Sequence, residues 1–192
     1  MTDLDRPRLF DGHGALFHTL LSRSRRYGEY GMGLSTLAAA KTTERLIRSV
    51  DTSEQWKIHV ANQLSEQQQA QTTLIHVDLG PVRDWGFPAS YEGRARFPDY
   101  FDAPWEEEFD PDLVLIDGRF RVACFLSSLL RAKPGTLILF DDYTERAYYH
   151  IVETCLAPEQ RSERQAVFRV PQTGVDRDRV AALLERFTYV MD

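Results

Sequence analysis

The side chains best suited to chemistry in this sequence are carboxylates that follow predicted β-strands. One or two acids follow each of five such strands: Glu29, Asp51, Asp78, Asp117 and the pair Asp141–Asp142. Because ligands of an open α/β sheet bind beyond the carboxyl ends of the strands, these acids would line one ligand-binding edge. Asp also favours turns in proteins without an active site, so a single acid says little. Five strand ends of this kind predict a functional edge.

The first of these acids precedes a glycine-rich turn. Gly31 and Gly33 permit positive φ and a close approach of backbone or ligand. Ser35 and Thr36 can cap the helix that follows. About twenty residues after the turn, Asp51 ends an apolar run, as in a βαβ nucleotide-binding unit whose acid binds a ribose hydroxyl. An ordinary glycine-rich turn of an α/β protein is the alternative.

Two motifs carry a family resemblance. The segments Glu29-x-Gly31-x-Gly33-x-Ser35 and Ser49-Val50-Asp51 resemble the first two motifs of class I S-adenosylmethionine-dependent methyltransferases. The resemblance implies S-adenosylmethionine as cofactor, with its methionine end at the glycine turn and its ribose at Asp51. The sequence departs from the family pattern at Ser35, which replaces a third glycine, and in the polar stretch before Glu29. The implied cofactor-binding residues are Glu29, Tyr30, Gly31, Gly33, Ser35, Thr36, Asp51, Asp84, Trp85 and Asp117.

The second half of the chain extends the resemblance. Segments 112–118 and 133–142 look like the fourth and fifth strands of the same superfamily, and are particularly similar to small-molecule O-methyltransferases of the catechol type. In that group, acids after these strands hold a magnesium ion that orients a substrate hydroxyl. Asp117, Asp141 and Asp142 are the matching candidate ligands for Mg²⁺, a cation that prefers oxygen donors. Stretch 117–124 also resembles bacterial methyltransferase-like proteins without an assigned substrate.

Two arginines follow the first of these candidate metal ligands. Arg119 and Arg121 offer competing charge partners for the acids, and they would also suit an acidic substrate or one that carries phosphate. The sequence alone leaves both roles open.

The expected reaction requires few catalytic groups. Methyl transfer from a sulfonium is an in-line displacement, so positioning of donor and acceptor is the main contribution. A general base can remove the acceptor proton, and the candidates are Asp117, Asp141, Asp142, His76 and Tyr143. We therefore predict a methyltransferase that acts on a small hydroxylated or acidic acceptor. The alternatives are a catalytically inactive methyltransferase-like binding or scaffold protein and an NAD(P)-dependent oxidoreductase, although the Tyr-x-x-x-Lys pair of such enzymes is absent.

The composition and net charge of the chain limit the kinds of partner that it is expected to bind. The chain has 192 residues and a formal net charge of −6, which disfavours a nucleic-acid partner held by phosphate neutralisation. A run of membrane-spanning length is absent, so a small-molecule substrate without a membrane partner is expected. Cys124 and Cys155 fall in apolar helical patterns, which indicates buried thiols and a cytoplasmic location.

The order of the elements predicts the fold. Apolar runs alternate with amphipathic helical patterns along one domain, residues 1–192. This order predicts a Rossmann-like, doubly wound α/β fold, with a mostly parallel sheet, helices on both faces and a late antiparallel strand. Helices are expected at 9–21, within the N-terminal segment 1–26, and at 37–40, 56–64, 122–130, 148–156 and 180–184. Strands are expected to end at Glu29 and to span 46–50, 72–78, 113–116, 136–140, 165–170 and 187–191.

One long segment has no clear period. Residues 80–110 are dense in Pro, Gly and aromatic residues. Loops of this length in a compact domain are usually functional or disordered, and the aromatic content argues against disorder. We interpret the segment as a cover over the pocket that selects the substrate; a packed structural excursion is the alternative.

Overall fold

The computed structural model describes residues 9–42, 44–105 and 109–192. In these residues, seven strands form one sheet in the order β3-β2-β1-β4-β5-β7-β6. Strands β1 to β5 are parallel, and β7 is antiparallel to both of its neighbours. The strands are β1 Arg26–Tyr30, β2 Leu46–Asp51, β3 Thr72–His76, β4 Leu113–Ile116, β5 Leu137–Phe140, β6 Gln160–Ser162 and β7 Gln165–Arg169. The predicted fold class, including the late antiparallel strand, is confirmed.

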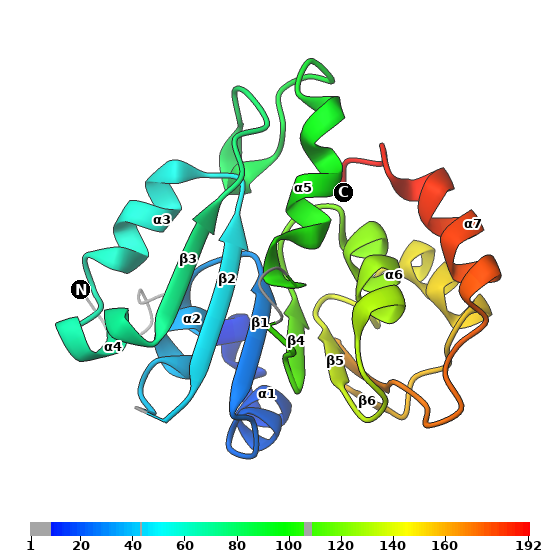
Figure 1. Cartoon of the computed structure of the whole chain (residues 1–192), viewed down its shortest axis with the longest axis horizontal. Coiled ribbons are helices and arrows are strands. Elements are labelled where there is room, and N and C mark those ends of the chain that lie inside the picture. The colour runs from blue at the N-terminus through cyan, green and yellow to red at the C-terminus, as the bar shows by residue number, and fades with distance from the viewer. Residues whose placement is uncertain (1–8, 43, 106–108) are drawn as a thin grey trace.

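Helices cover both faces of the sheet, with α5 and α6 in front of it and α1 and α2 behind it in Figure 1. None of the described helices is long and apolar enough to cross a membrane. The α-helices are α1 Ala15–Leu21, α2 Leu34–Ala39, α3 Glu54–Ala61, α4 Glu66–Ala70, α5 Phe97–Asp102, α6 Arg121–Arg131 and α7 Arg177–Phe187. The 3₁₀ segments are η2 Leu9–Gly12, η3 Asp84–Gly86, η4 Arg94–Arg96, η5 Ala103–Trp105 and η6 Ala147–Thr154.

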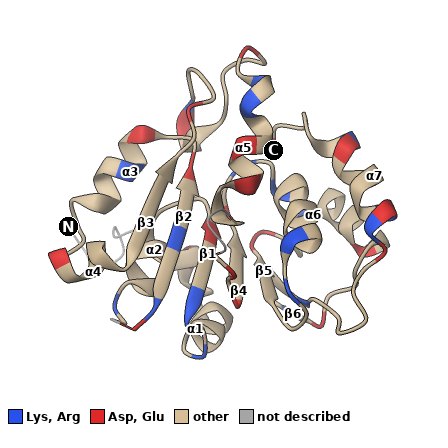
Figure 2. Cartoon of the chain, viewed as in Figure 1, with Lys and Arg blue, Asp and Glu red and all other residues tan. Residues whose placement is uncertain are grey.

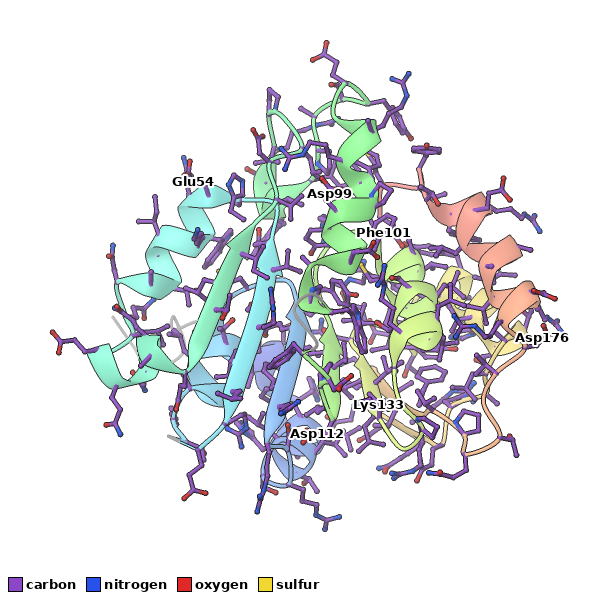
Figure 3. All side chains as sticks on the ribbon, in the orientation of Figure 1. Glu54, Asp99, Phe101, Asp112, Lys133 and Asp176 are labelled. Carbon is purple, nitrogen blue, oxygen red and sulfur yellow. The ribbon has the colours of Figure 1, made fainter. Side chains whose placement is uncertain are left out.

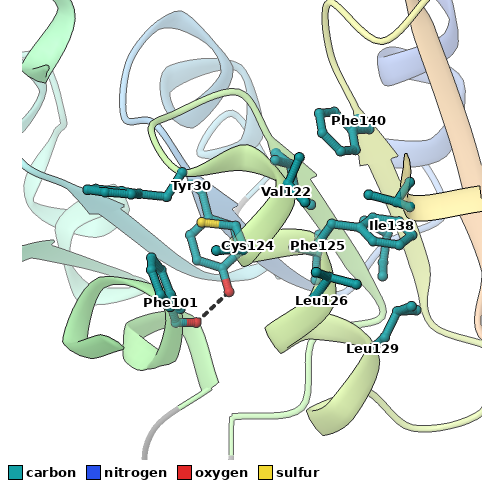
Figure 4. Packing of buried hydrophobic residues seen from close by; sticks show 14 of the residues in the cluster. Tyr30, Phe101, Val122, Cys124, Phe125, Leu126, Leu129, Ile138 and Phe140 are labelled. Carbon is teal, nitrogen blue, oxygen red and sulfur yellow. Dashed lines mark hydrogen bonds between the residues drawn. The ribbon is translucent and has the colours of Figure 1, made fainter. Parts of the chain in front are cut away.

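The central strands are apolar on both faces because each face has its own core. Successive side chains of a strand point to opposite faces. Val114 and Ile116 of β4 therefore join the core under α5 and α6, whereas Leu113 and Leu115 join the core under α1 and α2. Helix α6 contributes side chains at helical spacing to the first core: Val122, Phe125, Leu126 and Leu129. They lie beside Ile138 and Phe140 of β5 (Figure 4).

The amino ends of the strands are held by a carboxylate that precedes β4. Asp112 accepts hydrogen bonds from the Ser24 hydroxyl at 2.5 Å and from the Arg25 backbone N–H at 2.9 Å. Figure 3 shows Asp112 at this lower end of the sheet, with Phe101 and Asp99 of α5 nearer the opposite end. The fixed register of β1 and β4 brings the loops after these strands together at the carboxyl edge.

The long segment 80–110 divides into two parts. Phe97, Tyr100 and Phe101 of α5 are buried, and the Tyr30 hydroxyl donates a 2.6 Å hydrogen bond to the Phe101 carbonyl (Figure 4). Residues 97–105 are therefore a packed connection between β3 and β4, and the predicted cover is wrong for this part. Helix α5 was not predicted, because aromatic residues lie all round it and therefore give no helical period. Residues 106–108 lie outside the described residues.

Further elements differ from the sequence prediction; the expected helix 148–156, for example, is the 3₁₀ segment η6. The expected helix 9–21 consists of η2 and α1, because positive φ at Phe10, Asp11 and Gly12 interrupts it. The expected strand 187–191 is wrong, since α7 runs to Phe187 and the following residues form no strand. Strand β6 was not predicted because it has only three residues, two of them exposed.

Candidate functional site

The glycine-rich turn is built on a buried carboxylate. Glu29 of β1 is completely buried, and its two oxygens accept hydrogen bonds from four hydroxyl groups. The donors are Tyr27 at 2.9 Å, Thr36 at 2.5 Å, Ser49 at 2.6 Å and Ser35. Burial raises the pKa of Glu29, and these hydrogen bonds oppose the rise. Glu29, Ser35 and Thr36 therefore hold the start of α2 against β1 and β2, and their polar groups are already used.

The next acid lies beside the turn. The carboxylate of Asp51, at the end of β2, accepts hydrogen bonds from the backbone N–H of Met32 at 3.0 Å and of Ser53 at 2.7 Å. Burial raises the pKa of Asp51, whereas these backbone N–H groups lower it. The predicted βαβ geometry thus brings Asp51 to the glycine turn. At Gly33, a Cβ atom would meet nothing within 4 Å, so the turn has open space on that side.

Close packing fixes the turn on its other side. Gly31 has φ +93°, and a Cβ atom there would lie 2.6 Å from the backbone nitrogen of Gly118. Only glycine can therefore occupy this position without displacing the loop after β4. The contact places the backbone of Asp117 and Gly118 directly against the glycine turn.

Segment 84–86 borders the same acid. The Thr52 hydroxyl donates a 2.5 Å hydrogen bond to the Gly86 carbonyl, and a Cβ atom on Gly86 would lie 3.3 Å from an Asp51 oxygen. Trp85, which precedes Gly86, has φ 60° and is 78% exposed, so its indole presents a large apolar surface to solvent. Asp84 is exposed as well. An exposed indole can stack on a planar ring, which fits the predicted cofactor role of this segment.

The acids that follow β4 and β5 lie close together, but arginine side chains already form ion pairs with them. Oxygens of Asp117, Asp141 and Asp142 lie within 4.8 Å of one another. Arg121 contacts Asp117 at 3.0 Å and Asp142 at 3.2 Å. Its guanidinium also donates to the carbonyls of Gly118 at 3.1 Å, Asp141 at 2.9 Å and Asp117 at 3.1 Å. We call these three acids with Arg121, Arg146 and Arg164 the acid–arginine cluster.

The other two arginines complete the charge balance. Arg146 contacts Asp142 at 2.7 Å, and Arg164 contacts Asp141 at 2.8 Å and also pairs with Asp142. Burial raises the pKa of Asp117, and Arg121 opposes that rise. Basic and acidic residues are interspersed along the ribbon over the whole view in Figure 2. The acids of the cluster are thus neutralised by the chain itself.

This arrangement does not fit the expected magnesium ion. A divalent cation needs several free oxygen ligands around one position. Arg121, whose side chain is 4% exposed, directs its donors at Asp117, at Asp142 and at the carbonyls of both strand ends. The guanidinium supplies the positive charge that a metal ion would supply at this position.

We expect millimolar MgCl₂ to leave the melting temperature of the protein unchanged. A ligand that binds only the folded state raises the temperature of unfolding, whereas a cation without a site has no such effect. Differential scanning fluorimetry measures the shift, with NaCl at equal ionic strength as control. A rise with MgCl₂ that EDTA reverses would contradict the arginine-filled site.

Two tyrosines expected at the site lie in the core. Tyr30 is fully buried, and its hydroxyl also accepts a 2.9 Å hydrogen bond from Trp105. Tyr143 is fully buried too, and its hydroxyl donates to Glu153 at 2.7 Å. Burial raises the pKa of both phenols. The hydroxyls of Tyr30 and Tyr143 are therefore engaged within the core, and the predicted roles of Tyr30 in cofactor binding and of Tyr143 as a base stay predictions.

Two further residues at the carboxyl ends of the strands already have other hydrogen-bond partners. Asp78 is exposed and accepts the backbone N–H of Gly80 in its own turn, so it does not join the other acids. His76 has Nε2 at 3.2 Å from the Thr52 carbonyl. The predicted convergence of five strand ends thus holds for four of them.

Sequence reasoning missed the residues that arrive from far along the chain. Arg164 and Gln165 belong to the β6–β7 hairpin, and Gln165 donates to Asp141 at 2.9 Å. Only the antiparallel register of β7 beside β5 brings them there, and no local motif signals it. Ser49 was visible in the sequence, because it lies in the Ser49-Val50-Asp51 motif beside Glu29.

Comparisons with known proteins identify similar folds. The chain is similar to a methyltransferase-like protein from Silicibacter pomeroyi, with 30% identity and a TM-score of 0.83 over 95% of this chain and 98% of that one. An RNA methyltransferase from Salinibacter ruber, solved with S-adenosyl-L-homocysteine, shares 14% identity over 87% of this chain and 95% of its own, with a TM-score of 0.53. A cofactor-bound protein from MTB shares 15% identity over 96% of this chain and 70% of its own, with a TM-score of 0.51. No family model and no curated protein matches the sequence.

Proposed function

Because the chain belongs to the class I S-adenosylmethionine-dependent methyltransferase superfamily, we propose that it transfers the methyl group of S-adenosylmethionine to a small hydroxylated or acidic acceptor. The observation that carries the proposal is the contact between Asp51 and the glycine turn, at 3.0 Å from the Met32 N–H. This contact joins the acid that would bind a ribose to the backbone that would bind an amino acid.

The residues present fit the cofactor. Asp51 would accept hydrogen bonds from the ribose hydroxyls, and the backbone around Gly33 would receive the methionine end, where the turn has open space. Trp85 would cover the adenine ring. Glu29 would support the turn from the sheet side through its four hydroxyl partners.

When bound, the cofactor supplies an electrophilic methyl group on a sulfonium. The task of the protein is to hold the acceptor in line with that methyl group and to exclude water. Of the proposed bases, Asp117, Asp141 and Asp142 are in ion pairs with arginines, and His76 contacts a carbonyl. Such an edge suits an acceptor that is already ionised or ionises readily, since it requires no strong base.

Isothermal titration calorimetry with S-adenosylhomocysteine tests the cofactor part of the proposal. We expect saturable binding at one site per chain. A flat titration at millimolar ligand, with correctly folded protein, would refute it. Release of S-adenosylhomocysteine in the presence of a panel of hydroxylated and carboxylated small molecules then tests turnover.

The proposed bases Asp117 and Asp141 are already in ion pairs with arginines. This also favours a second candidate function, that of a catalytically inactive methyltransferase-like binding protein. Cofactor binding without turnover over the whole acceptor panel supports this alternative. Turnover of any acceptor excludes it.

A further inference from the structure

The two arginines of the β4–α6 loop have different environments. Arg121 is buried and fully engaged in the acid–arginine cluster. Arg119 is half-buried, and its guanidinium makes no hydrogen bond or ion pair with any residue in the described part of the chain. Its Nε atom is buried and has no partner. A buried donor without a partner is costly, so this position requires an acceptor that the described chain does not supply.

The backbone around Arg119 is held firmly. The Tyr100 hydroxyl accepts a 3.3 Å hydrogen bond from the Arg119 backbone N–H. Phe120 has φ 54°, and its buried ring packs against Phe97, Tyr100 and Phe101. The left-handed backbone of Phe120 and its packed ring hold the loop in place, so the backbone that carries Arg119 is rigid.

Arg119 also lies beside the proposed cofactor site. It follows Gly118, whose backbone abuts Gly31 of the glycine turn. Burial raises the pKa of Asp51 and of Asp192, and the charge of Arg119 opposes that rise; neither carboxylate is within 4.0 Å of its guanidinium, the limit for an ion pair. Both carboxylates have other partners: Asp51 accepts two backbone N–H groups, and Asp192 accepts the Tyr148 hydroxyl at 2.6 Å and the Arg121 N–H at 2.8 Å.

We propose that Arg119 binds an oxyanion, a carboxylate or a phosphate, on the methyl acceptor. The proposal rests on the proposed methyltransferase function and narrows its acceptor to the anionic class. A guanidinium presents parallel N–H donors that match the two oxygens of such a group. Because Arg121 is committed to the cluster, Arg119 is the arginine of this loop that can meet a substrate.

The experiment uses probes that differ only in charge. Salicylate is compared with salicylamide, and phenyl phosphate with phenol, each titrated into the protein saturated with S-adenosylhomocysteine. At least one anionic probe is expected to bind more tightly than its neutral partner, and Arg119→Gln should weaken that probe about ten-fold or more, with Arg119→Lys in between. Arg96→Gln is the matched control, since Arg96 is exposed and pairs with Asp99 at 3.2 Å on another segment.

The possible results distinguish a failure of this proposal from a failure of the proposed methyltransferase function. Binding of S-adenosylhomocysteine should stay within two-fold of wild type in Arg119→Gln. If that binding is lost while the melting temperature is unchanged, Arg119 serves the cofactor and the proposal is overturned. Equal binding of charged and neutral probes, or of an anionic probe to wild type and Arg119→Gln, also overturns it. Failure of wild type to bind S-adenosylhomocysteine would instead refute the proposed function.

Discussion

Asp51→Ala is expected to abolish measurable binding of S-adenosylhomocysteine. The carboxylate lies at the end of β2 beside the glycine turn and would accept both ribose hydroxyls. Each charge-assisted hydrogen bond contributes about 1.5–3 kcal/mol, so the loss of two weakens binding by about two to four orders of magnitude. The variant also frees the Met32 N–H, which loosens the turn. Calorimetric titration of both proteins measures the change.

Asp78→Ala is the matched control for this substitution. Asp78 also follows a strand of the same sheet, but it is exposed and accepts only the Gly80 N–H. Its removal should leave binding within about two-fold of wild type. Asp51→Asn retains the shape and one acceptor oxygen, and intermediate affinity is expected. Wild-type affinity in Asp51→Ala, with an unchanged unfolding curve, would remove the ribose role from Asp51.

The carboxyl-edge site could be predicted where local patterns determine it. The continuous apolar runs of β4 and β5 predict strands buried on both faces, and each is followed by its acid. The spacing from Gly31 to Asp51 predicts two adjacent parallel strands, and this adjacency puts the acid at 3.0 Å from the turn. Local periodicity and strand order were sufficient for these features.

Features that depend on distant pairing could not be predicted in this way. No local motif places Arg164 against Asp141, because the contact needs the hairpin to fold back beside β5. Likewise, Arg119 and Arg121 are two residues apart and chemically identical. Only the packing of Phe120 between them, with its left-handed φ, gives Arg121 to the cluster and leaves the Nε of Arg119 without a partner among the described residues.

Arg121→Met is expected to destabilise the fold by about 3–5 kcal/mol, the usual effect of removing one partner from a buried ion pair. The guanidinium is 4% exposed and contacts two carboxylates and three carbonyls. Without it, three carboxylates whose oxygens lie within 4.8 Å face one another with less compensating charge. Urea denaturation at neutral pH measures the loss. Arg146→Met is the control, since Arg146 is 47% exposed and contacts the cluster only through Asp142, so a loss of about 1 kcal/mol or less is expected.

The pH dependence of this loss distinguishes charge from packing. Burial raises the pKa of Asp117 to about 7 even with Arg121 present, so the folded state binds a proton there more tightly than the unfolded chain does. Removal of Arg121 raises that pKa further, and protonation then relieves the repulsion. The stability deficit of Arg121→Met should therefore narrow as the pH falls from about 9 to about 7, between the raised pKa of the variant and that of the wild-type group, and should change little below about 6. A deficit that stays constant over this range would mean that Arg121 acts through packing alone, and the cluster would then no longer be a charge-balanced substitute for a metal site.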